Sequence, residues 1–326
     1  NENIELTAQI IRRLRQLGVA HVYIEDTRLE GVNWEKGLNV SEETRMRALG
    51  VVRKTFAELS SSQYWERNYF QPRWARRELK AVFEDLLSEL LANKQGMVMF
   101  GHIYVWDRHL YHHSLNVALL TLALAVKQNY DKQQLMEIGI GGLLHDIGKT
   151  RVPREVLDKP GKLTEEEFAI VQRHTEYGFH ILRAQDALPP LAAQCAYQHH
   201  ERLNGTGYPH GLHGADIHPY AKIIAVADVY SAMISARVYQ QKRDLLYVLQ
   251  ELHRMSFEEL DAHTTHTFIR HMIPNFIGKR VKLSSGETGI IVMTHPSDFF
   301  RPLIRLDDRF VDLSIDRSLE VCEIYL

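Results

Sequence analysis

Histidine is concentrated in one part of this sequence, and that feature constrains the fold more than any other. Twelve of the 18 histidines fall between His102 and His218. Around them, residues 96–275 carry apolar side chains at helical spacing, with loops expected at 148–163, 184–189 and 202–219. Histidine is the commonest metal ligand in proteins and titrates near neutral pH. We therefore expect a mainly α-helical region whose helices bring several imidazoles into one site.

The rest of the chain divides into a segment before this region and one after it. Its 326 residues suggest about two domains, or one large and one or two small, at ~150 residues each. Residues 1–95 are predicted to be a small α-rich sensing or packing segment, and 276–326 a small antiparallel β-unit. The predicted N-terminal elements are a helix over 4–17, a strand over 20–24, a helix from Ser41 to 60–62 and a connector helix over 73–95. The predicted C-terminal strands are 280–283, 288–293, 303–306, 310–313 and 319–324.

Composition excludes several classes of protein. The 39 basic and 41 acidic residues give a net charge of −2, without the basic excess typical of nucleic-acid binding. Two cysteines are too few for a disulfide framework and fit a reducing compartment. No run of 18 apolar residues is present, so we expect no membrane span in this chain and a cytoplasmic location. The sequence begins with Asn1 rather than Met, which leaves open whether residues upstream of it were removed.

The first candidate motif is an adjacent histidine and aspartate at the end of an apolar helix. The residues over 138–144 predict that helix, His145 and Asp146 follow it, and Gly148 stands where a C-terminal cap is expected. An imidazole beside a carboxylate offers two metal ligands, and the carboxylate can bridge two ions. A lone pair of this kind more often only caps the last turn of a helix.

Two further candidates lie on apolar helical stripes. Asp228 is the only charged residue on the stripe of its predicted helix. A buried unpaired carboxylate costs several kcal/mol, so this residue needs a cation. His113 lies on a stripe with leucines and a valine, where a single histidine is more often a core residue with a satisfied hydrogen bond.

The remaining candidates are a histidine pair with the loop after it, and a separate histidine. His199 and His200 end a helix and lead through Glu201 into a loop containing Gly205, Gly207 and Gly211. Glycines let a backbone approach a ligand closely, and Tyr208 can stack on a flat ligand. Alone, this loop is an ordinary connector. His174 is expected on a helix that begins near Thr164, and taken alone it is expected at the surface.

Together these candidates form a metal-ligand set of five imidazoles and two carboxylates. They are His113, His145, Asp146, His174, His199, His200 and Asp228. Seven nitrogen and oxygen ligands suffice for two divalent ions bridged by Asp146, with positions left for water. The mixture suits Fe, Mn or Zn better than Mg or Ca.

The order and spacing of these motifs resemble the HD-GYP family, the branch of the HD-domain metal phosphohydrolases that cleaves cyclic di-GMP. The motifs that carry the resemblance are His113-Ser114, His145-Asp146-Ile-Gly-Lys149, His174, His199-His200-Glu201, Gly205-x-Gly207-Tyr208-Pro209, Ala227-Asp228 and Arg237. The resemblance covers roughly residues 100–275, and the Gly-Tyr-Pro signature separates this branch from other HD hydrolases. It implies an HD-type helical bundle over 96–275.

The resemblance also implies a role for each site residue. One metal would be held by His113, His145, Asp146 and Asp228, and the second by His174, His199 and His200, with Asp146 bridging. Lys149 would contact a phosphate, and Arg237 a phosphate or a guanine. The loop residues Gly205, Gly207, Tyr208 and Pro209 would shape the substrate pocket and engage signalling proteins. The sequence leaves open whether the chain forms a homodimer.

The sequence departs from the family pattern after the last metal aspartate, and one histidine fits the pattern incompletely. Ser231 and Val238 replace an aspartate and a proline, and Gln240 stands where a basic residue is frequent, which affects substrate positioning but no ligand. His109 lies four residues before His113, where some three-metal members carry glutamate and many two-metal members an aromatic residue. We expect two metals and place His109 in the pocket wall or next to a ligand, with the role of a ligand to a third metal left open.

The expected function is therefore a metal-dependent phosphodiesterase that hydrolyses cyclic di-GMP to pGpG, GMP or both. A hydroxide bridging two divalent ions would attack the phosphorus, with Asp146 and Lys149 as catalytic residues. Iron or manganese is favoured, with zinc, nickel or cobalt as alternatives. Two other functions stay open: hydrolysis of another cyclic dinucleotide such as cyclic GMP-AMP, and a receptor for cyclic di-GMP with weak catalysis.

Overall fold

The computed structural model describes residues 7, 40–60, 73–92, 110–186, 188–235 and 245–325. The chain forms two units, Asn1–Gly37 and Leu38–Leu326, and the description below concerns the second. The helix expected over 4–17 and the strand expected over 20–24 lie outside the described residues. His109 and Arg237 also lie outside them.

Two N-terminal helices begin the described part. These are α2 (Glu42–Ser60) and α4 (Arg73–Ala92), which confirm the helices predicted from Ser41 and over 73–95. The Ser41 hydroxyl accepts a hydrogen bond from the Thr44 backbone N–H at 3.3 Å and donates one to Glu89 of α4 at 3.0 Å. This capping interaction joins the start of α2 to α4. Both helices pack against the helices that follow, so the boundary placed at residue 95 stays a prediction.

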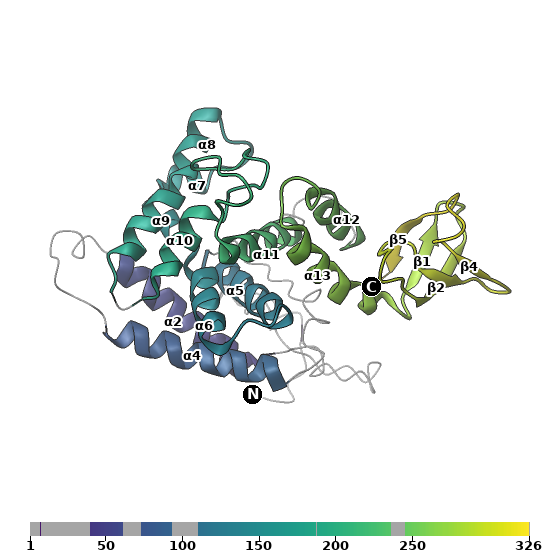
Figure 1. Cartoon of the computed structure of the whole chain (residues 1–326), viewed down its shortest axis with the longest axis horizontal. Coiled ribbons are helices and arrows are strands. Elements are labelled where there is room, and N and C mark those ends of the chain that lie inside the picture. Colours follow the sequence, from purple (N-terminus) through teal and green to yellow (C-terminus); the bar gives the residue numbers. More distant parts are fainter. Residues whose placement is uncertain are drawn as a thin grey trace. The chain divides into compact units, whose positions relative to one another are not determined.

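Five helices build the core that carries the candidate site (Figure 1). They are α5 (Leu110–Lys127), α6 (Lys132–Leu144), α9 (His174–Arg183), α10 (Pro190–Gln198) and α11 (Pro219–Ser235). Helix α5 packs against α6 and α11, and α10 packs against α6 and α9. Residues 114–125 of α5 are all buried, as expected of a helix surrounded by others.

Shorter elements connect and extend this core. They are the 3₁₀ helix η4 (Ile147–Arg151), α7 (Arg154–Leu157), α8 (Glu165–Gln172), α12 (Leu245–Met255), α13 (Ala262–Met272) and the 3₁₀ helix η6 (Ile273–Phe276). The predicted loops over 184–189 and 202–219 are present, whereas that over 148–163 contains η4 and α7. Among the described residues, no helix is both long enough and apolar enough to cross a membrane.

The expectation that Gly148 caps a helix is wrong. Helix α6 ends at Leu144, and Gly148 lies within η4. A Cβ atom on Gly148 would stand 1.8 Å from the carbonyl oxygen of His174 and 2.5 Å from the backbone nitrogen of Gly178. Glycine is therefore needed here because α9 passes directly against η4.

The position inferred for His174 when it is taken alone, at the surface on the helix that begins near Thr164, is also wrong. Helix α8 ends before it, Arg173 separates the two helices, and His174 is the first residue of α9. Its side chain is fully buried rather than at the surface. The contact between α9 and η4 covers His174, and the spacing of apolar residues near His174 in the sequence does not predict this contact.

A five-stranded antiparallel sheet follows the helices, as predicted. Its strands are β1 (Arg280–Leu283), β2 (Thr288–Met293), β3 (Leu303–Arg305), β4 (Phe310–Asp312) and β5 (Val321–Tyr325). The strand order is β4-β3-β2-β1-β5, so β5 returns to pair with β1. Val281, Ile291 and Ile304 are buried and form part of the apolar core. The boundary between this sheet and the helical region at 275 stays a prediction.

Candidate metal centre

The seven candidate ligands come from five places in the helical core, and the structure brings them together. The side chains are His113 on α5, His145 and Asp146 after α6, His174 at the start of α9, His199 and His200 after α10, and Asp228 on α11. Their ligand atoms form three overlapping groups, each with all its atoms within 4.8 Å of one another. These groups are Asp146 with His174, His199 and His200; Asp146 with His113 and His145; and Asp228 with His145 and His199.

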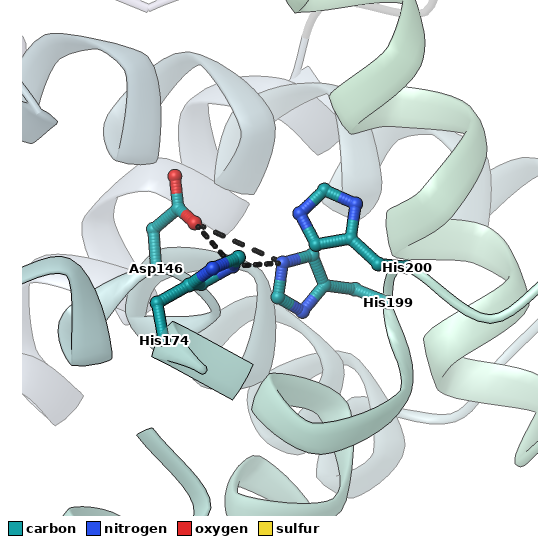
Figure 2. A group of neighbouring side chains, drawn as sticks. All are labelled: Asp146, His174, His199 and His200. Atoms are coloured by element: carbon teal, nitrogen blue, oxygen red, sulfur yellow. Dashed lines mark hydrogen bonds and ion pairs between the residues drawn. The ribbon is translucent and has the colours of Figure 1, made fainter. Parts of the chain in front are cut away.

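Asp146 lies at the centre, and its two carboxylate oxygens face different histidines. Oδ1 lies 3.4 Å from Nε2 of His174 and 3.8 Å from Nε2 of His199. Figure 2 shows this oxygen pointing toward both rings. Oδ2 lies 3.3 Å from Nε2 of His145 and 3.7 Å from Nε2 of His113. A carboxylate arranged in this way can offer one oxygen to each of two cations.

Asp228 completes the side of the site that Oδ2 faces. Its Oδ1 atom lies 2.9 Å from Nε2 of His113 and 3.8 Å from Nε2 of His145. The carboxylate is almost fully buried. Two imidazoles therefore lie beside this carboxylate. They are candidate ligands for the same cation that the position of Asp228 on an apolar helical stripe led us to expect.

Backbone carbonyls fix the orientation of three of the histidines. The Nδ1 atoms of His145, His174 and His199 lie 2.7, 2.6 and 3.0 Å from carbonyl oxygens of the preceding helical turn. A carbonyl oxygen only accepts hydrogen bonds, so each Nδ1 carries the ring hydrogen. In the neutral rings, Nε2 then presents a lone pair to the centre, as a metal ligand does.

The atoms at the centre lack the partners that they need without a cation. Nε2 of His174 and Nε2 of His199 face each other at 3.4 Å (Figure 2). Burial lowers the pKa of His174 to about 3 and also lowers that of His199, so both rings are neutral and two lone pairs oppose each other. Nε2 of His145 and Oδ1 of Asp146 are buried without a hydrogen bond. These residues fit a divalent metal centre with nitrogen and oxygen ligands.

The charges around the carboxylates keep both of them ionised. Burial alone would raise the pKa of Asp146, but Lys149 and His145 hold it well below its usual value. The Lys149 ammonium lies 2.6 Å from Oδ2, and its side chain is 26% exposed. Burial likewise opposes ionisation of Asp228, and the hydrogen bond and charge of His113 lower its pKa. Two ionised carboxylates in a buried centre attract a cation.

The glycine-rich loop packs directly on the second histidine of the pair. The Tyr208 ring stacks on the His200 ring at a centroid distance of 4.6 Å and an angle of 25°. The Tyr208 backbone N–H donates to the His200 carbonyl at 3.2 Å. A Cβ on Gly207 would lie 2.4 Å from the Arg202 nitrogen, so only glycine permits this approach. Gly205 has a φ of +81° and also suits glycine.

The sequence did not predict the structural role of two residues near the centre. Glu201 is 2% exposed, and its carboxylate accepts backbone hydrogen bonds from His210 and Leu212, both at 2.8 Å, which hold the loop in place. Its position directly after the histidine pair was the available signal. Ser231, noted only as a departure from the family pattern, places its hydroxyl 3.1 Å from Nδ1 of His113.

Comparison with known proteins gives the class of protein that this fold and site define. Residues 99–264 match the HD domain family. This match takes in half of the chain, and the chain belongs to the HD domain family.

The more particular resemblance to the HD-GYP branch is confirmed by curated relatives. A cyclic di-GMP phosphodiesterase of Pseudomonas aeruginosa is 31% identical over 225 residues, covering 69% of this chain and 54% of the relative. One of Thermotoga maritima is 36% identical over 194 residues, covering 59% and 51%. A 3′3′-cGAMP-specific phosphodiesterase of Vibrio cholerae is 35% identical over 180 residues, covering 54% and 41%. The chain thus spans about half the length of the curated relatives that it matches.

A solved structure supports the fold. An HD-GYP-type protein from Bdellovibrio bacteriovorus aligns with a TM-score of 0.58 and 18% identity. The alignment covers 80% of this chain and 78% of that one. At this identity the likeness concerns the fold alone, and it agrees with a mainly helical HD-type bundle.

Proposed function

We propose that this protein is a metal-dependent phosphodiesterase that hydrolyses cyclic di-GMP. The observation that carries the proposal is the shared carboxylate of Asp146, whose two oxygens face different histidines across a buried centre. The names of the Pseudomonas and Thermotoga relatives support cyclic di-GMP as the substrate.

We assign two divalent ions to the centre, bridged by Asp146. The first position takes His113, His145 and Asp228, and the second takes His174, His199 and His200. Two such ions, when bound, activate water near neutral pH and neutralise charge on a phosphate. The mixed set of imidazoles and carboxylates without thiolates fits first-row transition metals; we favour iron or manganese, with zinc, nickel or cobalt as alternatives.

The residues around the ligands bind and orient the substrate. Lys149 lies within reach of the centre and is partly exposed, so its ammonium can pair with a non-bridging phosphate oxygen. Arg237 is assigned to a phosphate or a guanine because a guanidinium can make two parallel hydrogen bonds to either. Tyr208 and the glycines of its loop form one wall of the pocket, and His109 is assigned to another.

In the proposed reaction, water adds to one phosphorus in line with the bond from phosphorus to the 3′ oxygen. That bond breaks, the 3′ oxygen takes a proton, and the product is the linear dinucleotide pGpG. A second hydrolysis of the remaining phosphodiester gives two GMP molecules. Lys149 stabilises the negative charge that grows on the phosphate oxygens during each step.

A second candidate substrate is the cyclic GMP-AMP dinucleotide. The Vibrio relative specific for 3′3′-cGAMP is as similar to this chain as the cyclic di-GMP enzymes are. Partner proteins at the loop Gly205–Pro209, a homodimer and a cytoplasmic location stay predictions.

The decisive experiment is incubation of the purified chain with either cyclic dinucleotide. The protein is loaded with Mn(II) or, without oxygen, Fe(II), and the products are separated by chromatography. Faster conversion of cyclic di-GMP to pGpG or GMP supports the proposal, and faster conversion of cyclic GMP-AMP favours the second candidate. Tight binding of cyclic di-GMP with no product would instead identify a receptor.

A further inference from the structure

His113 differs from the other well-oriented histidines in the partner of its outer nitrogen. His145, His174 and His199 each place Nδ1 on a backbone carbonyl. Nδ1 of His113 instead lies 3.1 Å from the hydroxyl of Ser231. Ser231 is 3% exposed and lies on α11, three residues after Asp228. Its hydroxyl is thus a buried partner supplied by a side chain.

A hydroxyl and a carbonyl differ in which positions of the ring hydrogen they allow on a neighbouring imidazole. A carbonyl only accepts, so it fixes the ring hydrogen on Nδ1 and leaves Nε2 free for a metal. A hydroxyl can accept from Nδ1–H, or rotate and donate to a bare Nδ1. Ser231 therefore permits either position of the ring hydrogen of His113.

Without a metal, the inner nitrogen of His113 has a partner that requires a hydrogen. Nε2 lies 2.9 Å from Oδ1 of Asp228, and an ionised carboxylate only accepts. Nε2 therefore carries a hydrogen and donates it to Asp228, whether the ring is neutral or protonated. On the opposite side of the centre, Nδ1 of His174 and Nδ1 of His199 each donate to a backbone carbonyl, so the ring hydrogen is already away from the two Nε2 atoms that face each other.

Lys149 adds to the difference between the two sides. Its ammonium lies 2.6 Å from Oδ2 of Asp146, the oxygen that faces His113 and His145. A cation on that side must replace this ammonium as well as the hydrogen between His113 and Asp228. A cation on the side of Oδ1 replaces no hydrogen bond of Asp146, since that atom has none.

We propose that Ser231 is a positioning residue that lets the ring hydrogen of His113 move from Nε2 to Nδ1 when metal binds. Because a metal ion at the position formed by His113 and Asp228 must replace both the hydrogen between them and the Lys149 ammonium, this position binds metal more weakly than the position formed by His174 and His199. It therefore fills second. This inference rests on the two-metal assignment of the proposed function and adds an order of loading.

The test is a titration of the metal-free full chain with Mn(II), followed by calorimetry and elemental analysis. The wild type should bind two ions in two separate steps. Ser231→Asp supplies a partner that only accepts, which holds the hydrogen on Nδ1 as a carbonyl does. It should tighten the weaker step by about 10-fold or more, within the range known for partners of metal-bound histidines, and leave the stronger step within twofold.

Two further variants separate the hydrogen-bond effect from a general disturbance. Ser231→Thr keeps a hydroxyl and should reproduce both wild-type steps. Ser256 is a matched control, because it is also buried and its hydroxyl lies 3.3 Å from Nε2 of His266, which is not a candidate ligand. Ser256→Asp should leave both metal steps unchanged.

A spectroscopic readout on the unaltered protein keeps the inference testable if Ser231→Asp fails to fold. Two-bond ¹H–¹⁵N spectra of ¹⁵N-histidine-labelled, metal-free protein report which ring nitrogen carries a hydrogen, and His113→Asn identifies the relevant signal. We expect a hydrogen on Nε2 without metal and on Nδ1 with two ions bound.

Three results would overturn the inference while leaving two bound ions in place. They are two steps of equal affinity, a Ser231→Asp protein whose weaker step is unchanged, and a metal-free His113 whose only ring hydrogen is on Nδ1. A wild type that binds no divalent ion would contradict the proposed function itself, so the two failures are distinguishable.

Discussion

Two histidine–aspartate pairs in this chain have nearly the same geometry and very different surroundings. In the helical region, Nε2 of His113 lies 2.9 Å from Asp228. In the sheet region, Nε2 of His295 lies 3.0 Å from Asp312. Both pairs join residues far apart in sequence, and distance alone does not separate a metal site from a surface ion pair.

The difference lies in the hydrogen bonds of the neighbouring atoms. The side chain of Asp312 is 24% exposed, and its Oδ1 also accepts hydrogen bonds from the Ser314 backbone and hydroxyl at 2.9 and 2.6 Å. That carboxylate is satisfied without a cation. In the helical region, Oδ1 of Asp146 and Nε2 of His145 are buried without hydrogen bonds. Unsatisfied buried atoms, more than the pair itself, indicate a ligand.

The variant that tests this contrast most severely is Asp146→Asn. We expect the loss of bound metal and of hydrolysis together, because an uncharged amide no longer provides an anionic oxygen for each of two ions. The loss in metal affinity should exceed about 100-fold, the upper end for residues that merely support ligands. Elemental analysis and the chromatographic assay measure both effects.

Asp312→Asn is the matched control for that variant. It makes the same change in the satisfied pair of the sheet, and it should keep the wild-type metal content and turnover. Two metals and near-normal turnover in Asp146→Asn would show that the bridging assignment is wrong.

The second prediction concerns the contact that brings His174 into the centre. Gly148→Ala places a Cβ 1.8 Å from the His174 carbonyl, so α9 and η4 must separate. We expect destabilisation by more than about 2 kcal/mol, measured by chemical denaturation, and weaker metal binding. Gly50→Ala, in α2 with no atom within 4 Å of the added Cβ, should instead stabilise the protein by about 0.5–1 kcal/mol. Equal effects of the two substitutions would contradict the close packing.

The third prediction compares one thiol in each region. Burial in the helical core raises the pKa of Cys195 to about 12, whereas Cys322 on β5 is exposed. Because only a thiolate reacts readily, native protein should incorporate one iodoacetamide per chain at neutral pH, on Cys322. Denatured protein should incorporate two, and peptide mass spectrometry locates them. Rapid native labelling of Cys195 would contradict its burial.

The smallest expected effect is the pH dependence contributed by Asp312. Hydrogen bonds from Ser314 lower the pKa of this carboxyl, with His295 adding to the shift. A folded-state pKa below the unfolded value of about 3.9 stabilises the protein above that pH, and the contribution is lost as the pH falls through the folded pKa. The melting temperature of Asp312→Asn should therefore lie slightly below that of the wild type at pH 6 and approach it near pH 3. A difference that grows with acidity would have the wrong sign.

The sequence was a good guide wherever the relevant pattern was local. Helical spacing predicted α2, α4 and the helices of the core, and alternation with turns predicted all five strands. Each candidate ligand except Asp228 had an ordinary explanation when taken alone, and the set indicated a metal site only when the candidates were counted together. The family signature then grouped these side chains before any of their distances were known.

Local patterns failed where a contact from a distant segment decided the outcome. Gly148 has the position of a helix cap, yet its role is set by α9. His174 has the pattern of a surface residue, yet η4 and the centre cover it.

The residue types of the centre were therefore determined by the sequence, whereas the state of each atom was decided only by the tertiary structure. Which oxygen of Asp146 faces which ring, and which nitrogen of His113 carries a hydrogen, depends on side chains from other helices, such as Ser231, 118 residues from His113. Hydrogen-bond partners fix tautomers and lone pairs over about 3 Å in space. Spacing along the chain carries no information at that scale.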